Sequence, residues 1–126
     1  MFKLHTVGSA KTAPMEYYEG TTAENIVIGE LLKLVSGKLT ACAATDIPEF
    51  VAVGNGKGTV IPVIRVMEDM EFEAPLSAAG TSLKVGDKVT TANALTATAT
   101  TTSGVFMISQ ILGTAVGDKI RGNFRR

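Results

Sequence analysis

Residues 85–89 read Val-Gly-Asp-Lys-Val, and residues 116–120 read Val-Gly-Asp-Lys-Ile. Each Gly-Asp pair favours a tight bend, because glycine accepts positive φ and aspartate can hydrogen-bond its own backbone. The β-branched residues on either side favour extended structure. A looser relative, Ile28-Gly29-Glu30-Leu31, occurs nearer the start of the chain. The repeat predicts bends that lead into strands of a small all-β barrel or sandwich, with a binding turn as the alternative interpretation.

The composition limits the class of protein. A chain of 126 residues forms one domain and can bury a core without disulfides. Its 12 basic and 12 acidic residues argue against a nucleic-acid partner, which needs an excess of Lys and Arg to meet phosphates. The single cysteine, Cys42, excludes an internal disulfide and a cysteine-rich zinc site. We expect Cys42 to be a small buried residue rather than a nucleophile, because no histidine lies near it in sequence.

No membrane span or signal peptide is expected. No segment reaches the roughly 20 continuous apolar residues that a membrane-spanning helix needs, and the first residues lack the apolar region of a signal peptide. We therefore expect a soluble protein made and kept in a reducing cytoplasm before any later assembly.

Residues 1–20 differ from residues 21–126, which we expect to form the β body. Apolar residues are scattered through this first segment without a sustained period, and Pro14 removes a backbone donor. One interpretation is a frayed terminus. The other is an extended N-terminal arm that becomes ordered against a partner, since both tyrosines of the chain fall here and amphipathic rings are favoured at interfaces. The candidate contact residues of such an arm are Phe2, Leu4, Val7, Tyr17 and Tyr18.

The body shows about eight short strands separated by glycine bends. Residues 26–44 predict a hairpin, with a helix over 23–35 as the competitor. The Asn55-Gly56 pair predicts a second hairpin, in which Pro62 indicates an edge or a bulge. Residues 90–102, rich in Thr and Ala, predict an exposed strand and loop. Together these elements indicate a small barrel or compact sandwich.

The inventory of chemically active residues is thin. His5 is the only histidine, so no multi-histidine metal site exists. Glu71 and Glu73 alternate with apolar residues, which is typical of the solvated side of a strand rather than an acid–base pair. Residues 54–59 lack the order of a phosphate-binding loop and fit a hairpin tip. We therefore expect no enzyme, no cofactor and no catalytic or metal-binding residue.

The order of phrases along residues 20–126 resembles a known family. The phrases are SGKLTACAATDIPEFVAVGNGKG, VIPVIRV, LKVGDKVTT and SGVFMISQILGTAVGDKIRGNF. They resemble the small capsid decoration proteins of tailed bacteriophages, also called head-stabilising or cement proteins. The resemblance rests on turn and strand patterns and transfers no functional residue.

This resemblance implies a β-rich fold and a symmetric homo-oligomer, commonly a trimer. It also implies a virion protein on the outer capsid surface that bridges subunits of the major capsid protein and so stabilises the shell. Two alternatives stay open. One is another virion β-module, such as a head fibre base or a tail protein, and the other is a small ligand-binding or enzymatic β-domain.

Overall fold

The computed structural model describes residues 1–8 and 10–124, in which twelve strands form two antiparallel five-stranded sheets and one hairpin. Sheet A, in spatial order, consists of β1 (Lys3–Val7), β7 (Met70–Pro75), β12 (Lys119–Phe124), β11 (Phe106–Ile111) and β8 (Lys88–Val89). Sheet B consists of β2 (Met15–Glu19), β6 (Val60–Arg65), β5 (Phe50–Ala52), β3 (Leu31–Val35) and β4 (Lys38–Ala41). The hairpin pairs β9 (Thr91–Ala92) with β10 (Thr96–Ala97).

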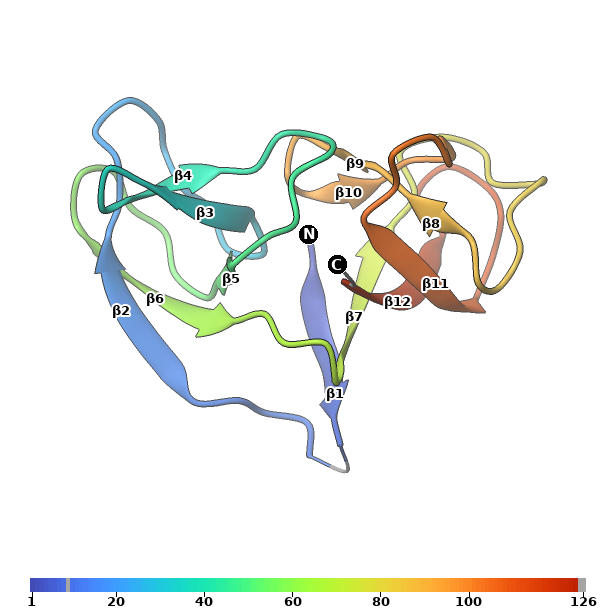
Figure 1. Cartoon of the computed structure of the whole chain (residues 1–126), viewed down its shortest axis with the longest axis horizontal. Coiled ribbons are helices and arrows are strands. Elements are labelled where there is room, and N and C mark those ends of the chain that lie inside the picture. The colour runs from blue at the N-terminus through green and yellow to red at the C-terminus, as the bar shows by residue number, and fades with distance from the viewer. Residues whose placement is uncertain (9, 125–126) are drawn as a thin grey trace.

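The all-β expectation is confirmed, and the architecture is a compact sandwich-like one rather than a closed barrel. Sheet B lies at the left and sheet A at the right of Figure 1, with β1, an edge strand of sheet A, near the centre beside β7. The strands are more numerous than the expected eight because β1 and β2 lie in the segment expected to be an arm, and because β8, β9 and β10 are only two residues long each. Such short segments carry too few residues for a period of two to be visible in the sequence.

The two Val-Gly-Asp-Lys repeats fold as the same turn. Their glycines have left-handed backbones, with φ of 97° at Gly86 and 88° at Gly117. Each aspartate carboxylate accepts a hydrogen bond from the backbone N–H three residues earlier, at 2.9 Å for Asp87 and 3.0 Å for Asp118. The turns lead directly into β8 and β12. This confirms the prediction that the repeat is a folding signal.

The looser relative forms a turn of the same shape ahead of β3. Gly29 has φ of 84°, and the Glu30 N–H donates to the Val27 carbonyl at 3.2 Å. Unlike Asp87 and Asp118, however, Glu30 is a buried residue. Its side chain therefore lies in an environment that the two aspartates do not share.

The N-terminal segment is part of both sheets, so the expectation of a separate extended arm over residues 1–20 is wrong. Strand β1 pairs with β7, and β2 pairs with β6. Phe2 is 1% exposed, and its ring centroid lies 5.4 Å from that of Phe106 and 5.5 Å from that of Phe124. The sequence hides this strand because a register shift between Leu4 and Thr6 interrupts the period of two.

The Thr- and Ala-rich segment also lies deeper than expected. Thr91, Ala94 and Ala97 are no more than 1% exposed. Their small side chains let other backbone segments approach closely: the Ala94 carbonyl accepts from the Leu31 N–H at 2.8 Å, and the Ala97 carbonyl accepts from the Ser77 N–H at 2.8 Å. The prediction of an exposed strand and loop over residues 90–102 is therefore wrong for residues 90–97, which form a largely buried hairpin, whereas residues 100–102 are exposed as expected.

The two predicted hairpins are confirmed. Strands β3 and β4 pair around a turn at Ser36 and Gly37, so the helix that competed for residues 23–35 does not form. Strands β5 and β6 pair on either side of the Asn55-Gly56 loop. Pro62 does not mark an edge strand, because β6 lies between β2 and β5. The Val53 N–H donates to the Pro62 carbonyl just beyond the end of β5. The Pro62 nitrogen faces the same side and has no proton to donate back, which fits the end of the β5–β6 ladder at this point.

A candidate protein-binding groove

The two tyrosines of β2 point to opposite faces of sheet B. Tyr17 pairs with Pro62 and therefore shares the face toward sheet A. Tyr18 lies on the other face, where its ring centroid is 4.8 Å from that of Phe50. Tyr17 and Tyr18, although adjacent in the sequence, therefore lie on different surfaces of the molecule.

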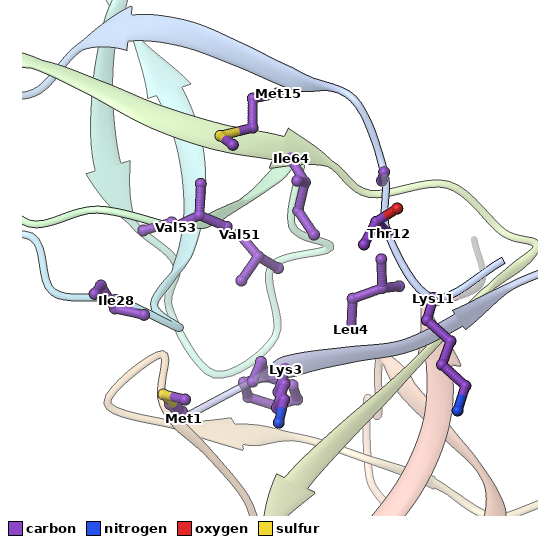
Figure 2. A pocket seen from close by; sticks show the side chains of 13 residues that line it. Met1, Lys3, Leu4, Lys11, Thr12, Met15, Ile28, Val51, Val53 and Ile64 are labelled. Carbon is purple, nitrogen blue, oxygen red and sulfur yellow. The ribbon is translucent and has the colours of Figure 1, made fainter.

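The face of sheet B toward sheet A forms one wall of a groove of about 280 Å³. The other wall is β1 with the residues that precede and follow it. Figure 2 shows the side chains of Leu4, Val51 and Ile64 converging on the hollow. The residues lining the groove are Met1, Phe2, Lys3, Leu4, Lys11, Thr12, Ala13, Met15, Ile28, Val51, Ala52, Val53 and Ile64.

The groove has a closed end and an open end. At the closed end Val51 and Ile64 are 2% and 6% exposed, because β1 covers them. At the open end the same face of sheet B continues through Met15, Tyr17 and Val60, which are 57%, 64% and 63% exposed. Glu19 pairs with Val60 and lies on the same face, where its carboxylate is 2.6 Å from the Lys38 ammonium. Uncovered apolar side chains bordered by polar groups are typical of a protein–protein contact.

The charges of the groove are of one sign. Lys3 and Lys11 contribute to its lining, and no acidic residue does. The ammonium groups of both lysines lie on the side of β1 away from Val53 (Figure 2). On that side Lys3 lies opposite Glu73 of β7, so a partner that reaches past β1 would meet charges of both signs.

On the opposite face of sheet B, oppositely charged side chains pair with one another. Arg65 donates two hydrogen bonds to the Glu16 carboxylate, at 2.9 and 2.8 Å, and its guanidinium carbon lies 4.9 Å from the centre of the Phe50 ring. The hydrogen bond from Arg65 is the main cause that lowers the pKa of Glu16, and the hydrogen bond to Glu16 is the main cause that raises the pKa of Tyr18. Because these groups satisfy one another, this face offers a partner less than the groove does.

The structure does not gather the five predicted contact residues at one site. Phe2 is buried in the core and is unavailable to a partner, which corrects its assignment as an anchor. Leu4 lines the groove, and Tyr17 lies on the exposed extension of its wall. Val7 is partly buried and pairs with Ala10, and Tyr18 faces away from the groove. A contact role for Leu4, Val7, Tyr17 and Tyr18 stays a prediction.

Sequence reasoning missed Met15, Ile28 and Val60 as surface candidates. Met15 and Tyr17 alternate with Glu16, which is a signal of a strand with one apolar exposed face. Val60 and Ile28 carry no such signal, because their exposure depends on where β1 and the turn before β3 come to lie.

One arrangement of polar groups combines a serine, a carboxylate and the histidine. The Ser109 hydroxyl donates to a Glu71 oxygen at 2.6 Å, and His5 Nε2 lies 3.6 Å from the other Glu71 oxygen. In a nucleophilic relay the histidine lies between the hydroxyl and the acid. Here the carboxylate lies between them, so the arrangement pairs surface strands and does not activate the hydroxyl.

Two further candidates are the thiol of Cys42 and clusters of possible metal ligands. Burial is the main cause that raises the pKa of the Cys42 thiol to about 12, which keeps it protonated. Among residues 1–8 and 10–124, no three His, Cys, Asp or Glu side chains are grouped so that they could hold a metal ion. The same residues contain no helix long and apolar enough to cross a membrane.

Comparison with known proteins provides one informative likeness. No protein-family model and no curated protein match the sequence. The fold is similar to that of a solved structure, the N base of the head fibre protein gp8.5 of bacteriophage phi29, with a TM-score of 0.61. The two are 20% identical, and the alignment covers 89% of this chain and 95% of that chain. The likeness shows that the two chains share a fold over nearly their whole lengths.

Proposed function

We propose that this chain is a structural protein of a phage virion that attaches to the outer surface of the head and contacts the major capsid protein through the groove. The observation that carries the proposal is the uncovered apolar wall at Met15, Tyr17 and Val60 on a fold shared with a phage head fibre base. The resemblance of the sequence to capsid decoration proteins supports the same class.

The mechanism is physical rather than chemical. Burial of the groove wall against a capsid subunit removes apolar surface from water and stabilises the contact. A symmetric homo-oligomer, which we take to be a trimer, multiplies this contact, since soluble oligomers usually close into point groups. Linked copies raise one another's effective concentration at the shell, so several weak contacts bridge and stabilise neighbouring subunits.

The second candidate is the base of a head fibre. Its support is the similarity in fold to the N base of gp8.5, since a fibre base must also present one surface to the head. The two candidates share the attachment surface. They differ in whether this domain bridges capsid subunits itself or holds a longer appendage to them.

Retention on capsids tests the proposal. Purified shells lacking this protein are mixed with wild type, with Tyr17→Asp or with Val85→Asp, and are then sedimented. Tyr17 and Val85 are equally exposed, at 64%, but only Tyr17 lies on the exposed extension of the groove wall, so Val85→Asp is the matched control. We expect Tyr17→Asp to lose retention by about tenfold or more, as for a central interface residue, with unchanged melting.

Equal retention of the two variants would contradict the groove as the attachment surface. If wild type itself does not sediment with shells, the assignment to the capsid surface is wrong. Shell melting separates the two candidates. A protein that bridges capsid subunits raises the temperature at which empty shells open, whereas a fibre base leaves that temperature unchanged.

A further inference from the structure

Glu30 departs from the pattern of the other two turns. Asp87 and Asp118 occupy the same turn position, and their carboxylates accept backbone hydrogen bonds at the surface. Glu30 is only 7% exposed, and its Oε2 atom has no hydrogen-bond partner within the described part of the chain. A buried carboxyl oxygen without a partner is costly when it is charged, so its presence needs a physical account.

The turn that carries Glu30 joins three parts of the molecule. The Gly29 carbonyl accepts from the Phe2 N–H at 3.0 Å, which ties the start of β1 to the turn. The Gly29 N–H donates to the Ala52 carbonyl in sheet B at 2.8 Å, and the Leu31 N–H donates to the Ala94 carbonyl between β9 and β10 at 2.8 Å. Ile28, in the same turn, lines the groove. Movement of this turn would therefore change both the groove wall and the hydrogen bond that anchors the start of β1.

The groups around Glu30 do not neutralise a negative charge. Glu24 is the charged neighbour that acts on it, and one Glu24 oxygen is held by the Ala41 N–H at 2.6 Å. Cys42 on the adjacent strand end keeps its proton, because its pKa is raised to about 12. The segment 91–97 contributes no titratable side chain, and no ion pair to Glu30 occurs among the described residues. Met1 packs against Gly29, and the pKa of its ammonium group is lowered by burial first and then by Lys119. Burial first, and then Glu24, raise the pKa of Glu30 to about 7.

We propose that Glu30 is a proton-sensitive switch: the turn at residues 27–30 stays closed while the buried carboxyl is neutral, and ionisation of the carboxyl releases the turn, the start of β1 and the adjoining groove wall. The direction follows from linkage. A carboxyl whose pKa is higher in the closed state than in the open state stabilises the closed state fully at low pH. That stabilisation is lost as the pH rises through about 7.

Hydrogen exchange measured by NMR on the full chain tests whether ionisation of Glu30 opens the turn. The amides of Phe2 and Leu31 report opening, because their hydrogen bonds span the turn. After correction for intrinsic exchange, we expect their open population to increase about tenfold or more between pH 5.5 and 8.5 in wild type. Glu30→Gln should remove this dependence, and Asp87→Asn, which changes the matching position of an exposed turn, should keep it.

A second measurement decides the case even if Glu30→Gln fails to fold. Titration of the Glu30 side-chain carboxyl carbon in wild type should give a midpoint near 7. A midpoint close to that of an ordinary glutamate overturns the proposal. So does a midpoint near 7 without any change in the exchange of Phe2 and Leu31, since the proton would then not be coupled to the turn.

Discussion

The closed and open ends of the groove are made of the same kinds of residue and differ in only one respect. At the closed end Phe2 and Val51 are 1% and 2% exposed, and at the open end Met15 and Tyr17 are 57% and 64% exposed. Both ends are apolar, but residues of β1 line the groove beside Val51, whereas Tyr17 lies outside the groove lining. The comparison teaches that apolar content alone does not separate a core from an interface. The path of a covering strand decides which of the two it becomes.

The largest expected effect lies at the closed end. Phe2→Ala should lower the free energy of unfolding by about 3–5 kcal/mol, because it leaves a cavity among the rings of Phe106 and Phe124. Chemical denaturation of wild type and variant measures this difference. Lys3→Ala, at the exposed neighbouring position, is the control and should stay within about 0.5 kcal/mol of wild type. A small effect of Phe2→Ala would restore the interpretation of residues 1–20 as a detachable arm.

An intermediate effect is expected at the turn that anchors β1, and it depends on pH. Glu30→Gln replaces a carboxyl whose pKa is raised to about 7 by a neutral group of the same shape. At pH 8 wild type bears the cost of the buried charge, so the variant should be more stable by about 2 kcal/mol. At pH 4 the wild-type carboxyl is protonated and the two should be nearly equal. Denaturation at both pH values checks the prediction, and a pH-independent difference would contradict it.

The smallest effect on stability is expected at the open end. Tyr17→Ser should change the free energy of unfolding by less than about 0.5 kcal/mol, because the ring is exposed and no described contact holds it. Thermal melting under the same conditions as for Phe2→Ala provides the measurement. A loss comparable with that of Phe2→Ala would show that the open end is core in solution and would remove the contrast between the two ends.

Local chemistry made much of the fold predictable. The Gly-Asp turns at residues 85–89 and 116–120 form as expected because their cause lies within four residues: a left-handed glycine and an aspartate that accepts a nearby N–H. The Asn55-Gly56 loop and the alternation over Met70–Pro75 are similarly local, and both appear as predicted. The all-β class follows from these elements together.

The candidate site was predictable only in part. Tyr17 and Leu4 were identified from residue type, and both adjoin the groove. Phe2 was misassigned because a bulge in β1 removes the period that would have marked it as core. Met15, Ile28 and Val60 were missed because an exposed apolar side chain has no distinct sequence pattern when its neighbours in space come from distant segments.

The sequence by itself determined where the chain bends, which segments are extended and that the fold is all-β, since each of these rests on the backbone preferences of a few adjacent residues. The tertiary structure alone decided that β1 and β2 enter different sheets, that Thr91 and Ala97 are buried, and that Glu30 carries an unpaired carboxyl oxygen. These outcomes depend on contacts between segments far apart in the chain. Burial at these positions is therefore a property of the assembled surfaces, and their residue types and local patterns do not specify it.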